Sequence, residues 1–158
     1  MELDRVKQVL AALRREGVAY KVLDGVALNL HGLPRFTQDL DLFVAPTAEN
    51  VERLRRALDS VFHDPELAGL VAEDLLGPYP AVQYVPPEGD FHVDVVTRLG
   101  EEFHFDELES GEVDLEGLPV EVVTPRQLYR MKKDTVRLRD RGDAELLRER
   151  FGLDEEPG

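Results

Sequence analysis

Two aspartates that lie two residues apart are the first candidates for chemistry in this sequence. Asp39 and Asp41 occupy the segment 39–44, where apolar residues alternate with them in a pattern typical of a β-strand. Side chains at this spacing point to the same face of a strand, so the two carboxylates are expected side by side. Like charges this close raise each other's energy unless a cation lies between them, and Mg²⁺ favours such oxygen ligands. Taken alone, the pattern also fits a solvated strand face.

A third carboxylate, Asp94, stands in another predicted strand over residues 91–97. The apolar residues of that segment share one face, and Asp94 lies on the opposite face together with His92. If this strand runs beside segment 39–44, three carboxylates converge. Two metal ions about 3.5–4 Å apart could then stabilise both the attacking and the leaving oxygen in phosphoryl transfer.

A short predicted helix, 26–31, lies just before these strands, between Gly25 and Gly32. A glycine-containing loop that leads into a helix exposes backbone N–H groups and a positive dipole, which favour phosphate binding. His31 is expected to cap or pack this helix. The order of the segments therefore predicts a phosphate-binding loop, a short helix and then the paired carboxylates.

The connecting loop 33–38 contains two further candidates, Arg35 and Thr37. Arg35 could contact a phosphate or pack the loop against Asp39. Thr37 could meet a ligand or bond the loop backbone. Both alternatives remain open from the residues alone.

The remaining elements form a mixed α/β pattern with a helical C-terminal portion. Residues 3–16 have helical apolar spacing, and Thr47 is a predicted N-cap for the helix that follows the first aspartate pair. We expect one domain over residues 1–152 and a loose acidic tail over 153–158. Further helices are expected at 66–75, from Pro125 through Met131, and at 143–151, and further strands at 19–23, 81–85, 113–115 and 120–123.

The composition limits the classes of partner. The chain has 158 residues, 42% of them hydrophobic, no cysteine and a net charge of −14. Disulfides and thiolate metal sites are therefore excluded, and a surface this acidic does not favour bulk nucleic-acid binding, which needs lysines and arginines. No apolar run approaches the roughly 20 residues of a membrane span, and no export signal is visible, so a cytoplasmic location is expected.

Residues 24–44, DGVALNLHGLPRFTQDLDLFV, resemble the signature of the nucleotidyltransferase superfamily, and in particular small prokaryotic proteins of the abortive-infection and toxin–antitoxin type. Their pattern is a Gly-Gly or Gly-Ser pair, an alanine, His-Gly and then an Arg-x-Thr-x-Asp-x-Asp run. The resemblance implies a nucleotidyltransferase fold with a mixed central β-sheet flanked by helices. It also implies that Asp39, Asp41 and Asp94 are the catalytic metal ligands.

The C-terminal part of the chain matches the same proteins, so the resemblance covers about residues 18–150. Met131-Lys132-Lys133, Arg137, Asp140 and Asp143 fall where relatives carry a Met-Lys, an arginine and two aspartates on paired helices. Lys132 is implied to reach nucleotide phosphates, with Gly25, Arg35 and Thr37. The residues alone allow ordinary ion pairs of Asp140 and Asp143 with Arg137 and Arg139.

The implied activity is a Mg²⁺-dependent transfer of a nucleoside monophosphate from a nucleoside triphosphate to an unknown hydroxyl acceptor. One departure bears on it: Asp24 occupies the first position of the expected Gly-Gly or Gly-Ser pair. A carboxylate there would repel phosphates unless it turns away or joins the metal ligands. The alternative is a catalytically degenerate member that binds nucleotide or acts with a protein partner encoded by an adjacent gene.

Overall fold

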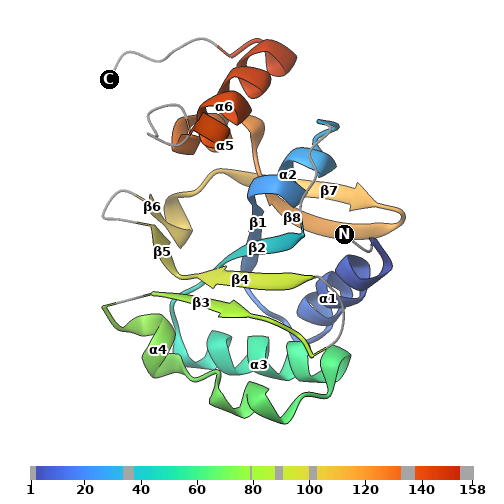
Figure 1. The fold of residues 1–158 in the computed structure, drawn as a ribbon, viewed down its shortest axis with the longest axis vertical. Coiled ribbons are helices and arrows are strands. Elements are labelled where there is room, and N and C mark those ends of the chain that lie inside the picture. The colour runs from blue at the N-terminus through green and yellow to red at the C-terminus, as the bar shows by residue number, and fades with distance from the viewer. Residues whose placement is uncertain are drawn as a thin grey trace.

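A six-stranded mixed sheet forms the centre of the molecule, in the order β3-β4-β2-β1-β8-β7 (Figure 1). The computed structural model describes residues 3–33, 38–78, 80–87, 91–99, 103–132 and 138–153. The strands of the sheet are β1 (Tyr20–Leu23), β2 (Asp39–Val44), β3 (Ala81–Tyr84), β4 (His92–Val96), β7 (Ser110–Leu115) and β8 (Leu118–Val123), and β5 (Arg98–Leu99) pairs separately with β6 (Phe103–His104).

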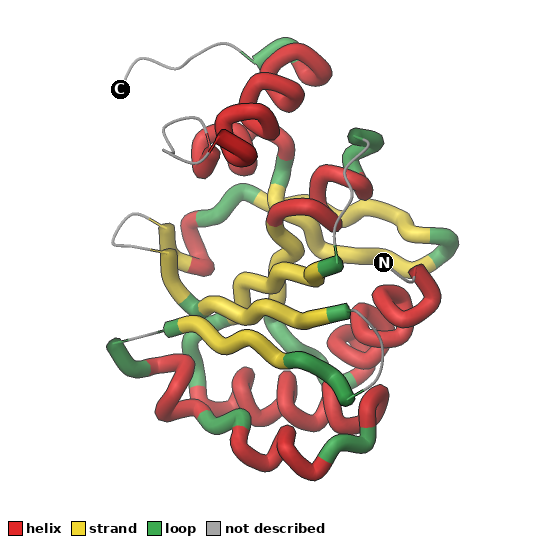
Figure 2. The backbone as a smooth tube through the Cα atoms, viewed as in Figure 1, coloured by secondary structure: helices red, strands yellow, loops and turns green. Residues whose placement is uncertain are grey.

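Helices lie on both sides of the strands, as the colouring in Figure 2 shows. In Figure 1, α3 and α4 lie below the sheet, α1 lies to its right, and α5 and α6 lie above it. The α-helices are α1 (Leu3–Arg15), α2 (Asp24–Leu30), α3 (Ala48–Phe62), α4 (Ala72–Leu76), α5 (Pro125–Lys132) and α6 (Leu138–Phe151), with short 3-10 turns η1 (Pro65–Gly69) and η2 (Phe105–Glu107). This arrangement confirms the expected mixed sheet with flanking helices and a helical C-terminal portion. Within the described ranges, no helix is both long and apolar enough to cross a bilayer.

The central strand β2 has one apolar face and one acidic face. Leu40 and Leu42 are completely buried, whereas Asp39 and Asp41 are only partly buried. β2 runs antiparallel to β1, the preceding strand, and parallel to β4, which follows much later in the chain. The buried leucines join the main core, and the aspartates are held on the opposite face.

The helix α3 is attached to the sheet by a buried asparagine. The Asn50 side chain accepts a hydrogen bond from Ala19 N at 2.8 Å and donates to Ala19 O and Ala45 O at 3.0 and 3.1 Å. Thr47 Oγ1 accepts from Asn50 N at 3.1 Å, which confirms the predicted N-cap. Asn50 therefore joins the start of α3 to the chain just before β1 and just after β2.

Several expected boundaries differ from the structure. The helix expected over 66–75 is two short elements, η1 and α4, separated at Leu70 and Val71. Leu70 and Leu75 are both buried, and their five-residue separation does not return to the same face of one α-helix. The break allows both side chains to reach the core. In addition, α6 begins at residue 138 instead of 143, and β5, β6 and η2 were not expected.

Candidate active site

The register between β2 and β4 brings the three predicted aspartates together. Asp41 lies directly opposite Asp94, and Asp39 lies opposite His92, in two strands that run parallel. Residues paired in this way share one face of the sheet. The expected convergence of the three carboxylates is therefore confirmed.

The negative charge at this face is only partly compensated. Burial, followed in order of effect by the neighbouring carboxylates of Asp24, Asp94 and Asp39, raises the pKa of Asp41 to about 8. In its protonated form Asp41 donates a hydrogen bond to Asp94. Burial and Asp39 also raise the pKa of Asp94. A proton thus holds together two carboxylates that a bound cation could neutralise instead.

Two neutral or weakly basic side chains border the aspartates. His92 Nδ1 contacts Asp39 Oδ1, as expected from the position of His92 on the same face of β4. Gln83 lies opposite Asp94 in the edge strand β3, and its hydrogen bond to Asp94 lowers the pKa of that carboxyl. Sequence reasoning missed Gln83, although its position among apolar residues in a predicted strand was a usable signal.

These oxygen donors fit a hard divalent cation chemically, although their side chains are not arranged around a single point. In the described part of the chain, no three acidic or imidazole groups are placed closely enough to hold a metal ion as they stand. Asp39 and Asp41 nevertheless lie on one strand face, and Asp94 already shares a proton with Asp41. Displacement of that proton would expose oxygen ligands of the type that Mg²⁺ prefers.

The start of α2 differs from the expected glycine loop. The helix begins at Asp24, so Gly25 lies within its first turn and is buried. Asp24 has a left-handed backbone with φ of 53°. This conformation is costly for most residues, and aspartate, asparagine and glycine tolerate it best. The expected glycine at the other end of the helix, Gly32, has φ of 90° and does end it.

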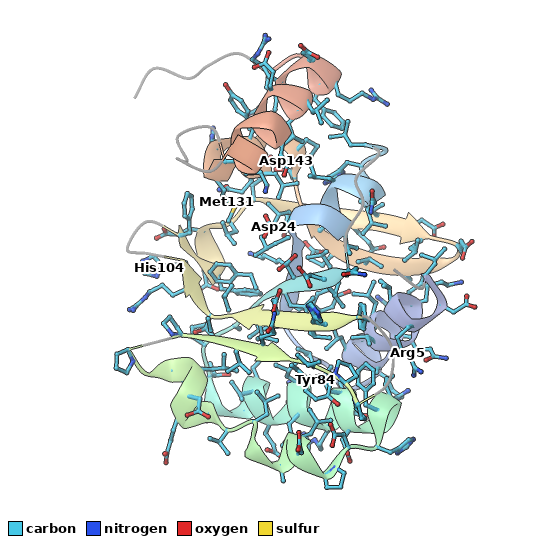
Figure 3. The ribbon with its side chains drawn as sticks, viewed as in Figure 1. Arg5, Asp24, Tyr84, His104, Met131 and Asp143 are labelled. Atoms are coloured by element: carbon cyan, nitrogen blue, oxygen red, sulfur yellow. The ribbon has the colours of Figure 1, made fainter. Side chains whose placement is uncertain are left out.

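Asp24 is joined to the C-terminal helices by an ion pair. Lys132 Nζ, at the end of α5, lies 2.9 Å from Asp24 Oδ1 and 3.3 Å from Asp143 Oδ2 in α6. Figure 3 shows Asp24 on the side of α2 that faces these two helices. Asp143, for which the sequence suggested an arginine partner, is therefore also a partner of Lys132. The side chains of Arg137, Arg139 and Asp140 lie outside the described residues.

Among the described contacts, the ion pair with Asp24 connects Lys132 to the acidic face. The lysine side chain is 5% exposed, which is unusual for a helix lysine. Arg35 and Thr37, the two predicted ligands in the connecting loop, lie outside the described residues. His31 packs as expected: its Nε2 is 2.8 Å from Val123 O, and its ring meets Phe151 edge-on.

Comparisons with known proteins agree with this geometry. The family model for the nucleotidyl transferase AbiEii toxin of type IV toxin–antitoxin systems matches residues 25–145. No curated protein sequence gives a significant match.

Solved structures resemble the fold at low sequence identity. The antibiotic-resistance factor ANT(2")-Ia, solved in complex with adenylyl-2"-tobramycin, has a TM-score of 0.56 and 15% identity, covering 93% of this chain and 87% of its own. The candidate nucleotidyltransferase of Thermotoga maritima has a TM-score of 0.57 and 15% identity, covering 95% and 92%. A nucleotidyltransferase-like antigen of Paracoccidioides brasiliensis has a TM-score of 0.56 and 14% identity, covering 93% and 77%.

Proposed function

Because this chain belongs to the AbiEii family of nucleotidyltransferase toxins, we propose that it transfers a nucleoside monophosphate from a nucleoside triphosphate to a hydroxyl acceptor. The observation that carries this proposal is the parallel pairing of β2 with β4. It places Asp41 opposite Asp94, with Asp39 one step along the same face. A carboxylate set on a rigid sheet suits a reaction whose catalysis consists mainly of positioning and charge stabilisation.

Asp39, Asp41 and Asp94 would hold one or two Mg²⁺ ions. When bound, these ions would neutralise the triphosphate and stabilise charge on the attacking and leaving oxygens. Asp94 would also accept the proton of the incoming hydroxyl. The acceptor oxygen forms a bond to the α-phosphorus, the bond from that phosphorus to the bridging oxygen breaks, and pyrophosphate leaves with the electron pair of the broken bond.

The nucleotide would be held by residues that border the acidic face. We propose that Gly25 allows close approach of the backbone to the phosphates, and that Arg35, Thr37 and Lys132 contact them. The support for Lys132 is its position: it is buried between Asp24 and Asp143, beside the carboxylate that most strongly affects Asp41.

The first experiment measures nucleotide binding and transfer separately. Thermal unfolding is followed with each nucleoside triphosphate, with Mg²⁺ and with a chelator, and transfer is followed with nucleotide labelled at the α-phosphorus. A ligand at 100 times its dissociation constant should stabilise the fold by roughly 2.7 kcal/mol. The double variant Asp39→Asn with Asp41→Asn should lose metal-dependent binding and transfer.

Asp59→Asn is the matched control, because Asp59 is an exposed aspartate on α3, which lies across the sheet from the acidic face. It should retain both binding and transfer. Absence of any metal-dependent shift with every nucleotide would refute the proposal. Transfer that survives in the double variant would refute the assignment of the metal ligands.

A second candidate function is nucleotide binding without transfer, in a degenerate member that acts on or with a protein partner. The observation that favours it is the Asp24–Lys132 ion pair, which neutralises the lysine expected at the phosphates. Metal-dependent binding without any labelled product would support this candidate. We propose an antitoxin as the protein partner, because the family is described as the toxin of a toxin–antitoxin system.

A further inference from the structure

We propose that Asp24 is a specificity-determining residue, whose carboxylate competes with nucleotide phosphate for Lys132 and thereby restricts the site to nucleotides that arrive with divalent cations. This inference rests on the proposed nucleotide-binding function. It concerns which ionic form of the nucleotide the site accepts, and it assigns a role to Asp24 in that choice.

The two carboxylates that hold Lys132 differ in accessibility. The Asp143 side chain is 6% exposed and remains with the lysine inside the packed pair of α5 and α6. The Asp24 side chain is 37% exposed and makes the shorter contact, 2.9 Å against 3.3 Å. A ligand entering from solvent can therefore reach and replace Asp24, but not Asp143. Of the two described carboxylate partners of Lys132 Nζ, Asp143 is enclosed, and Asp24 is the one that an incoming phosphate oxygen could displace.

The backbone conformation of residue 24 does not require an aspartate, so the side chain must account for its presence. Glycine adopts the φ of 53° freely, whereas aspartate adopts this conformation at a modest cost. The interaction that glycine could not supply at this position is the contact of the carboxylate with Lys132.

The charge around Lys132 explains the selectivity for metal-bound nucleotide. The described side chains of this region include one lysine and one histidine against five carboxylates. The five are Asp24, Asp39, Asp41, Asp94 and Asp143. With Lys132 already paired, a nucleotide without cations would meet mainly negative charge and would be repelled. A nucleotide that arrives with divalent cations supplies the positive charge itself, and can compensate for displacing Asp24.

A purely structural role for Asp24 makes a different prediction. If Asp24 only attached α2 to α5, its replacement would lower stability and leave nucleotide binding unchanged or weaker. If Asp24 competes with phosphate, its replacement should tighten nucleotide binding and make Lys132 newly important. The dependence of binding on Lys132, measured with and without Asp24, separates the two roles.

The test is a mutant cycle read by equilibrium binding, with ATP and the other three nucleoside triphosphates as probes. Lys132→Met is combined with Asp143→Asn in every arm, so that no buried aspartate is left without its cation. The arms are the unmodified protein, Asp24→Gly, the Lys132–Asp143 double variant and the triple variant, each with Mg²⁺ and with chelator. Glu112→Gln on the edge strand β7 is the charge-matched control, three strands away from β2 in the sheet.

With Mg²⁺, Asp24→Gly should bind nucleotide about ten-fold more tightly, an effect on the order of one charge interaction at a partly exposed site. In chelator it should show measurable binding where the unmodified protein shows none. Loss of Lys132 should weaken the Asp24→Gly protein about ten-fold, and the unmodified protein less than about three-fold. Glu112→Gln should behave as the unmodified protein does.

This inference would be overturned if nucleotide binding depended equally on Lys132 with and without Asp24. It would also be overturned if the unmodified protein bound nucleotide in chelator. In either case, Mg²⁺-dependent binding by the unmodified protein would still support the proposed function. If no variant binds any nucleotide, the proposed function fails, and the competition fails with it. Far-ultraviolet circular dichroism of each arm identifies variants that do not fold. In that case Asp24→Asn, which tolerates a positive φ and removes only the charge, replaces Asp24→Gly.

Discussion

Replacement of Asp41 by asparagine should stabilise the metal-free protein at alkaline pH. Asp41 is the carboxyl whose pKa rises from 3.8 to about 8, because of its burial and three neighbouring carboxylates. Above pH 8 the folded protein must ionise this group, whereas the unfolded chain ionises it near pH 4 without cost. Metal-free stability should therefore fall as pH rises from about 4 through 8. Asparagine removes the charge and can still donate a hydrogen bond to Asp94.

The size of the effect follows from the pKa difference. At 1.36 kcal/mol for each pKa unit, a rise from 3.8 to about 8 corresponds to about 6 kcal/mol if the carboxylate could neither move nor gain water. Asp41 is partly exposed, and the half-open face lets water screen the repulsion. We expect about 1–2 kcal/mol, or a rise in Tm of roughly 3–6 °C for a chain of this size.

The assay is thermal unfolding at pH 9 and pH 5 in chelator, followed by the same measurement with Mg²⁺. The advantage of Asp41→Asn should be large at pH 9 and small at pH 5. Saturating Mg²⁺ should reverse the order at pH 9, because only the unmodified protein retains the full set of ligands. A variant that melts at or below the unmodified protein at pH 9 in chelator would refute the electrostatic reasoning. Asp59→Asn, as a distant control, should show neither pH dependence nor reversal.

Three further changes test the packing around the site by chemical or thermal unfolding. Asn50→Ala should cost about 2–4 kcal/mol, because buried backbone groups beside β1 and β2 lose their partners; a cost below about 1 kcal/mol would contradict this role. Lys132→Met alone should lower the free energy of unfolding by about 3–5 kcal/mol, and the addition of Asp143→Asn should restore most of this loss. If stability is not restored, Lys132 and Asp143 are not energetically coupled. Glu116→Asn should raise Tm by roughly 2 °C, since residues 116 and 117 both have positive φ and Asn-Gly suits such a hairpin turn. A fall in Tm would show that the lost ion pair of Glu116 with Lys7 contributes more stability than the improved turn.

Local patterning was sufficient to predict most of the elements. The alternation in 39–44 and 91–97 predicted β2 and β4, and the apolar spacing of 3–16 predicted α1. Thr47 marked the start of α3 correctly. These predictions succeed because a strand or an amphipathic helix must place its apolar residues on one face wherever it lies in the fold.

Predictions failed where a boundary depended on packing. The division of 66–75 into η1 and α4 follows from the need to bury both Leu70 and Leu75 against distant elements. Asp24, at the early start of α2, is paired with Lys132, which is 108 positions away in the sequence. Neither contact leaves a local periodic signal, because the partners come together only when the chain has folded.

By itself, the sequence determined which residues could carry the chemistry: Asp39 and Asp41 must share a strand face, and Asp94 must oppose the apolar face of its own strand. The tertiary structure decided that β2 and β4 are parallel neighbours with Asp41 opposite Asp94. It also decided that Asp24 faces Lys132. The physical reason is that side-chain direction follows from local backbone geometry, whereas strand order and the ion pairs between distant segments depend on the packing of the whole core.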